Sequence, residues 1–120
     1  MLRLVNVERS RARCVPLTAN SALTSAARAH SADMARNNYF SHTSLDGRTA
    51  FQRMRAAGFT GRMMAENIAA GQRTAAAVMQ AWMNSPGHRA NILNCGYRYL
   101  GVGHVTGGSY GHYWTQDFGG

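Results

Sequence analysis

The sequence contains no lysine, so all thirteen of its basic residues are arginines. Only five residues are acidic, which leaves a formal net charge of +8 at pH 7. Such a charge favours anionic partners, among them nucleic acid, acidic cell-wall polymers and anionic lipid. The arginines, however, are scattered from Arg3 to Arg98, and no nucleic-acid recognition motif accompanies them. We therefore expect a solvated basic surface, with an anionic cell-surface polymer as a candidate partner and no specific nucleic acid.

Long apolar runs are also missing. No stretch approaches the roughly 18 consecutive apolar residues that a membrane-spanning helix needs. No signal peptide is evident, because no charged segment is followed by an apolar and then a small-residue segment. The 120 residues contain no internal repeat or low-complexity linker, and they are enough for one hydrophobic core. We expect a single domain over residues 1–120 that is monomeric and not transmembrane.

Cysteine is scarce: the two residues, Cys14 and Cys95, lie 81 positions apart. This spacing excludes a C-x-x-C redox motif and a zinc knuckle. Either the two form one disulfide in an exported protein, or they are buried free thiols in a cytosolic one. Closing so long a loop would add on the order of 4 kcal/mol of stability in the chain-entropy model. We favour the disulfide and a secreted, extracellular location.

Proline is rare as well, and one of the two prolines, Pro86, separates two expected helices. Proline disfavours helical geometry in the preceding residue, so a helix that arrives over about 75–84 stops by Ser85. Ser85 then serves as the N-cap, and Pro86 as the first residue, of a helix that runs to about Asn94. His88 falls at its third position, where backbone N–H groups lack helical partners. The alternative is a tight corner in which His88 only fills space.

Apolar residues at three- and four-residue spacing predict further helices. The longest follows Asn20, whose side chain is suited to capping it. His30 lies on its apolar stripe, where a histidine is more often a hydrogen-bonded core residue than a ligand. The expected helices before Ser85 cover residues 2–12, 21–37, 48–57 and 75–84.

The last quarter of the chain changes from helical to alternating periodicity, and residues 97–118 predict an antiparallel hairpin. Gly101 and Gly103 lie on one face of its first strand and leave room for the close approach of another element. His104 and His112 face each other across the hairpin; cross-strand pairing is the default explanation for them, and metal binding is a minority one. Helices followed by such a hairpin give an α+β domain in which helices cover a sheet.

Three polar residues stand out from their surroundings. His42 lies on a loop beside two aromatic residues, so packing positions it while it stays accessible. Glu66 interrupts an apolar run, and a buried carboxylate needs a histidine, an arginine or a metal as its partner. Together with His88 they make a set that suits a divalent transition metal, with water completing the coordination. The three lie 24 and 22 positions apart, so only the fold can bring them together.

Five stretches of the chain form a specific combination. They are Ser41-His42-Thr43, Ala65-Glu66-Asn67-Ile68-Ala69, Trp82 to Leu93, Gly101-Val102-Gly103 and Tyr113-Trp114-Thr115-Gln116-Asp117-Phe118-Gly119. Over nearly its whole length the chain resembles the CAP superfamily, also called the SCP-like extracellular family. That family includes cysteine-rich secretory proteins and plant pathogenesis-related proteins, and the spacing here is similar to its compact bacterial form.

The resemblance implies a three-layer α-β-α sandwich with a central antiparallel sheet and a central cleft. In such a cleft two histidines and two acids converge and can hold zinc or another divalent ion. Carried over by motif, the first histidine is His42, the first acid is Glu66 and the second histidine is His88. Ser85, with Asn84 beside it, stands where the second acid is expected. This departure removes a negative charge and leaves a three-ligand site or an ordered water network.

These residues support two main classes of function. The first is an exported bacterial CAP module that binds a divalent metal or a small ligand, lipid, glycan or protein in the cleft and acts by recognition. The second is a hydrolase. In it, Glu66 is the general base and the histidines hold zinc with a reactive water, or Ser85 is a nucleophile beside His88. We favour recognition and keep the hydrolase as the alternative. The serine version is the weaker of its two forms, because an N-cap role already explains Ser85 and no oxyanion hole is identifiable. A third class, a basic protein acting on anionic surfaces, requires no pocket.

Overall fold

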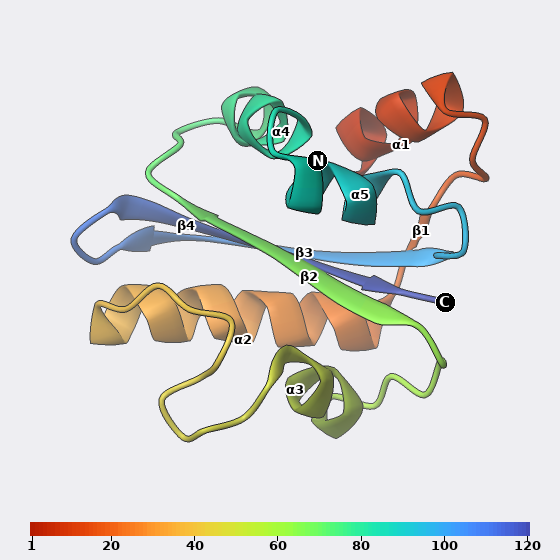
Figure 1. Cartoon of the computed structure of the whole chain (residues 1–120). Coiled ribbons are helices and arrows are strands. Elements are labelled where there is room, and N and C mark those ends of the chain that lie inside the picture. Colours follow the sequence, from red (N-terminus) through yellow and green to blue (C-terminus); the bar gives the residue numbers. More distant parts are fainter.

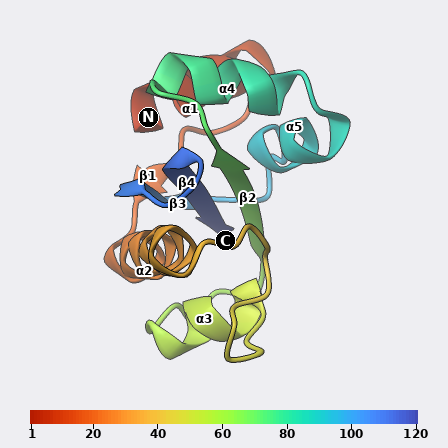
Figure 2. The same ribbon diagram turned by 90° about the vertical axis from the view of Figure 1, so that its left-hand side faces the viewer.

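The helices and strands form three layers, with a four-stranded sheet between two layers of helices (Figure 1). The computed structural model describes residues 1–120. One face of the sheet is covered by α1, α4 and α5, and the other by α2 and α3 (Figure 2). The elements in chain order are α1 (Leu2–Arg11), β1 (Thr18–Ala19), α2 (Ser21–Asn37), α3 (Ala50–Ala56), β2 (Met64–Ala70), α4 (Ala75–Met83), α5 (Pro86–Ile92), β3 (Tyr99–Gly107) and β4 (Gly111–Gly119). The predicted α-β-α sandwich is confirmed.

The sheet has the strand order β1-β3-β4-β2, so the hairpin that the sequence predicts lies at its centre. Residues 64–70, which looked only like an apolar run, form the edge strand β2 and pair antiparallel with β4 along their whole length. This register places Glu66 opposite Asp117. The sheet is antiparallel except at β1, a two-residue strand that runs parallel to β3.

The helix α2 lies directly on β3 because two glycines remove the side chains that would separate them. A Cβ atom added at Gly101 would lie 2.1 Å from the Leu23 carbonyl carbon. One added at Gly103 would lie 2.4 Å from the Ala27 oxygen. The expected close approach at these glycines is therefore confirmed, and any larger residue would push α2 off the sheet.

The corner between α4 and α5 follows the sequence prediction, with one correction. α4 ends at Met83 and Pro86 is the first residue of α5. Ser85 occupies the N-cap position, but its side chain accepts no hydrogen bond from the backbone of α5. The hydroxyl bonds to the side chain of His88 instead. The prediction that capping accounts for the Ser85 side chain is wrong.

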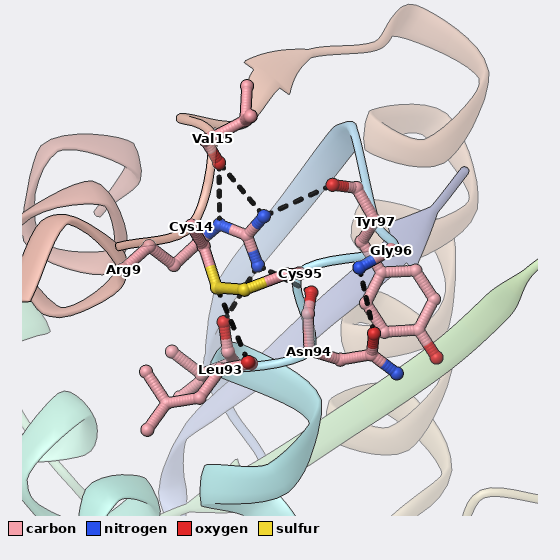
Figure 3. Close-up of a disulfide and its surroundings, with 9 residues drawn as sticks. Arg9, Cys14, Val15, Leu93, Asn94, Cys95, Gly96 and Tyr97 are labelled. Carbon is pink, nitrogen blue, oxygen red and sulfur yellow. Dashed lines mark hydrogen bonds between the residues drawn. A yellow bond between two sulfur atoms is a disulfide. The ribbon is translucent and has the colours of Figure 1, made fainter. Parts of the chain in front are cut away.

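The expected disulfide joins Cys14 to Cys95, with their Cα atoms 4.8 Å apart (Figure 3). Beside it lies Arg9 of α1, whose side chain is fully buried. Its guanidinium donates hydrogen bonds to four main-chain carbonyls that surround the disulfide. The acceptors are the oxygens of Val15, Ile92, Asn94 and Tyr97, at 2.8–3.1 Å.

Two arginines depart from the expected solvated basic surface. Arg9 is fully buried and Arg53 is 5% exposed. A guanidinium carries five N–H donors, so it can be buried where enough acceptors converge on it. The expectation of solvated arginines is therefore wrong at these two positions.

None of the helices combines the length and the apolar composition that crossing a bilayer requires.

Candidate functional site

Glu66 is the centre of the buried polar cluster beside β2, and its side chain is 2% exposed. Arg53 of α3 binds it in a two-pronged contact, with Nη1 2.9 Å from Oε2 and Nη2 3.0 Å from Oε1. His42 adds a third contact, since its Nδ1 lies 2.9 Å from Oε1. Both carboxylate oxygens are thus engaged by groups of the protein. Of the partners that the sequence left open for Glu66, the structure supplies both the arginine and a histidine.

Local structure places Arg53 and His42 together. A capping box formed by Thr49 and Gln52 starts α3 one turn before Arg53. Arg53 also donates a hydrogen bond to the main-chain oxygen of His42, which fixes the preceding loop to α3. The His42 side chain itself remains 54% exposed. His42 therefore has one edge held by the cluster and the rest of its ring available to solvent.

Asp117 of β4 completes the cluster from within the sheet. It is fully buried, and no N–H or hydroxyl group of the protein donates to its carboxyl oxygens. Burial, together with the negative charge of Glu66, raises the pKa of Asp117 well above its usual value. A neutral Asp117 can then donate its own proton to Glu66, its cross-strand partner.

The pKa of Glu66 is shifted in the opposite direction from that of Asp117. Burial alone would raise the pKa of Glu66, but hydrogen bonds from His42, Arg53 and Asp117 outweigh it and lower this pKa to about 2. One carboxyl of the pair is charged and the other is neutral, which avoids two buried negative charges side by side. Sequence reasoning missed Arg53 and Asp117. The signals for Asp117 were the scarcity of acids in the chain and its place in one of the five stretches that carry the family resemblance.

His88 lies in the first turn of α5, which packs against β2. Successive side chains of a strand point to opposite faces, so Asn67 points away from the Glu66 cluster. Its amide nitrogen donates to the main-chain oxygen of His88 at 3.1 Å. His88 Nδ1 lies 2.8 Å from Ser85 Oγ, and burial followed by the charge of His42 lowers the pKa of His88. With its proton on Nε2, a neutral His88 accepts a hydrogen bond from the Ser85 hydroxyl.

The predicted cleft is divided into two hollows along β2. His42 and Glu66 line one of about 510 Å³, together with Asn91. Ser85 and His88 line a second of about 320 Å³, beside Trp82. A larger hollow of about 630 Å³ lies between α2 and α3, and none of the four predicted site residues lines it.

The residues do not fit a preformed metal centre. No three histidine, cysteine, aspartate or glutamate side chains form a group that can hold an ion. Both oxygens of Glu66 already bind a fixed cation, Arg53, which a metal would have to displace. Ser85, in place of the second acid, supplies no charge. The predicted zinc site of His42, Glu66 and His88 stays a prediction for experiment.

Comparisons with known proteins agree with this architecture. The model of the cysteine-rich secretory protein family, CAP, matches residues 2–118. The chain belongs to this family. It is 43% identical over 118 residues to the uncharacterized protein YkwD of Bacillus subtilis, covering 98% of this chain and 45% of that protein. It is 35% identical to the uncharacterized membrane protein YlbC of the same organism, covering 98% of this chain and 33% of that protein. The CAP domain thus spans less than half the length of these two relatives.

Solved structures share the fold. An extracellular protein from Bacillus anthracis that contains an SCP domain superposes with a TM-score of 0.88 at 38% identity, covering 98% of this chain and 38% of the other. An outer surface protein from Borrelia burgdorferi gives 0.90 at 22% identity, covering 98% of this chain and 87% of the other. The second likeness shows the fold alone. The family resemblance is confirmed, and the two solved proteins are described as an extracellular protein and an outer surface protein.

Proposed function

We propose that this CAP domain acts outside the cell as a binding module, which recognises a small ligand in the hollow lined by His42 and Glu66. The single observation that carries the proposal is the saturation of Glu66 by Arg53 and His42. A general base needs a pKa near the working pH and a free oxygen within reach of the proton it removes. Glu66, with a pKa of about 2, has neither. It serves instead as a fixed anchor that orients His42.

The exposed face of His42 is the recognition element in this proposal. Its Nδ1 is held by Glu66, so Nε2 is the ring nitrogen that remains for a ligand. Apolar surface from Phe51 and Tyr97 lines the same hollow and can cover the ligand's carbon skeleton. A glycan or another small molecule with hydroxyl groups beside apolar faces matches this combination. A divalent metal is a second candidate ligand.

One observation favours a second candidate function. The contact of 2.8 Å between Ser85 Oγ and His88 Nδ1 is the geometry of a nucleophile beside its base. In a hydrolase, the Ser85 oxygen would attack a carbonyl carbon while its proton passes to His88 Nδ1. No third group orients the ring from the side of Nε2, so recognition remains our main proposal.

Binding and turnover can be measured on the same protein. We would record amide spectra by NMR while adding soluble peptidoglycan fragments, and separately follow hydrolysis of p-nitrophenyl acetate. Recognition predicts saturable shifts that His42→Ala abolishes and Ser85→Ala retains, with no hydrolysis above that of a Ser85→Ala control. Hydrolysis lost in both Ser85→Ala and His88→Ala would replace the proposal with the serine mechanism. Zinc titration of His42→Ala and His88→Ala tests the metal prediction directly.

A further inference from the structure

Two histidines meet at the turn end of the β3–β4 hairpin, and neither lines one of the two hollows along β2. His104 Nε2 lies 2.9 Å from His112 Nδ1, and both side chains are accessible to solvent. Their rings are nearly coplanar, with an angle of 14° between them and centroids 5.2 Å apart. The two nitrogens therefore point at each other. The predicted cross-strand pairing is confirmed, and it belongs to neither the buried core nor the proposed binding site.

Trp114 fixes one of these rings. It is the cross-strand partner of His104, and the two rings stack with centroids 3.8 Å apart and planes 5° apart. Trp114 is itself buried, and its indole N–H donates to the main-chain oxygen of Gln72 at 2.8 Å. The His104 ring thus rests on a side chain that has little freedom. An imidazole held in this way loses less rotamer entropy when it binds a ligand.

The chemistry of the pair suits a metal ion. Two nitrogens bonded at right angles to one ion, at about 2.0–2.1 Å each, lie about 2.9 Å apart. Burial, and then the charge of His112, lowers the pKa of His104, and a metal ion needs the ligating nitrogen unprotonated. The proton now shared between the rings moves to the far nitrogen of the same ring when an ion binds. Each ring must also turn by about 45°, away from the line that joins the two nitrogens, to direct its lone pair at an ion bonded at right angles.

We propose that His104 and His112 form a surface site for one divalent transition-metal ion, with water in the remaining positions. Among the divalent first-row ions, Cu²⁺ binds imidazole nitrogen most tightly, so Cu²⁺ is the probe with the highest expected affinity. A site with two protein ligands is compatible with the absence of any group of three. The inference does not depend on the proposed function, because none of its residues lines the hollow of His42 and Glu66.

The chain carries two tryptophans that report on the two regions. Trp114 stacks on His104, whereas Trp82 lines the hollow of Ser85 and His88. We would titrate the full chain with CuCl₂ and follow both indole N–H signals by NMR, with calorimetry for stoichiometry. We expect one ion per chain and broadening of the Trp114 signal before that of Trp82. His104→Ala and His112→Ala should each weaken binding by at least about tenfold, since loss of even an outer partner costs that much.

Matched variants separate this site from the cleft. Thr106→Ala alters the cross-strand neighbour of His112 without removing a ring, and it should bind Cu²⁺ like the parent. The double variant His42→Ala/His88→Ala should also retain binding. Either the absence of saturable binding, or binding that His104→Ala and His112→Ala both retain, would overturn the inference. Binding lost only in the His42/His88 variant would place the ion in the cleft. Circular dichroism of each variant would confirm its fold.

Discussion

The two buried arginines belong to helices on opposite faces of the sheet (Figure 2), and they bind different kinds of acceptor. Arg9 binds only main-chain oxygens, in the region that the disulfide also closes (Figure 3). Arg53 binds the side chain of Glu66 and through it controls which carboxyl of the Glu66–Asp117 pair is charged. Arg9 therefore stabilises the structure through neutral acceptors, whereas Arg53 is part of the electrostatics of the candidate site. The difference lies in the acceptor, because a carbonyl cannot titrate and a carboxyl can.

Replacing Arg53 should give the largest effect. Arg53→Met removes the cation from a buried pair and leaves Glu66 beside Asp117, so we expect a loss of about 3–5 kcal/mol in the free energy of unfolding. Urea denaturation at neutral pH measures it. Arg55→Met, on the same helix and exposed, is the matched control and should change little. A loss below about 1 kcal/mol would show that the pair is not buried as described.

Replacing Arg9 should cost somewhat less. Arg9→Met leaves four carbonyl oxygens without their donor. A buried neutral acceptor without a partner costs less free energy than a buried charge without one, so we expect a loss of about 3 kcal/mol in the free energy of unfolding. Arg11→Met, exposed at the end of α1, is its control. The two arginines should also differ in pH dependence. The cost of Arg9→Met should stay flat between pH 3 and pH 8, whereas that of Arg53→Met should shrink in acid as carboxyls take up protons.

Much of the fold depends on the preferences of single residues and could be predicted from the sequence. Asn20 caps α2 with its side chain as expected, and Pro86 starts α5. The close packing at Gly101 and the Cys14–Cys95 disulfide were also anticipated. Each of these rests on a backbone preference, or on a residue type with few structural uses.

The electrostatic part of the site could not be predicted in the same way. Nothing near Arg53 shows that its partner lies 13 positions away, because that contact exists only once β2 joins the sheet. β2 itself has little strand propensity, with alanine at three of its seven positions, so its conformation comes from pairing with β4. Arg9 looks like any solvated charge until the turn after α5 closes over it.

Replacing Asp117 should change the stability less than replacing either arginine, and the sign of this change should depend on pH. Its pKa is higher in the folded than in the unfolded protein, so the fold loses stability as pH rises above about 3.8–3.9, by up to about 1.4 kcal/mol per pH unit. Asp117→Asn keeps a donor for Glu66 and removes this titration. The variant should equal or exceed the parent in stability at pH 7 and lose that advantage near pH 3. Urea unfolding of the parent and the variant from pH 3 to pH 7 measures this difference in stability. If the parent gained stability relative to the variant between pH 4 and pH 7, Asp117 would be charged in the folded protein.

The smallest effect is expected at Ser85, where a hydroxyl binds a side chain rather than the backbone. Thr74 accepts a hydrogen bond from the Ala77 N–H and caps α4, so Thr74→Ala should cost about 1 kcal/mol. Ser85→Ala removes only the contact with His88 and should cost less than about 0.5 kcal/mol. It should at the same time raise the pKa of His88 if the hydroxyl donates to the neutral ring, which NMR titration of the His88 ring protons measures. An unchanged pKa together with a full capping cost would return Ser85 to a purely structural role and remove the observation that favours a serine hydrolase.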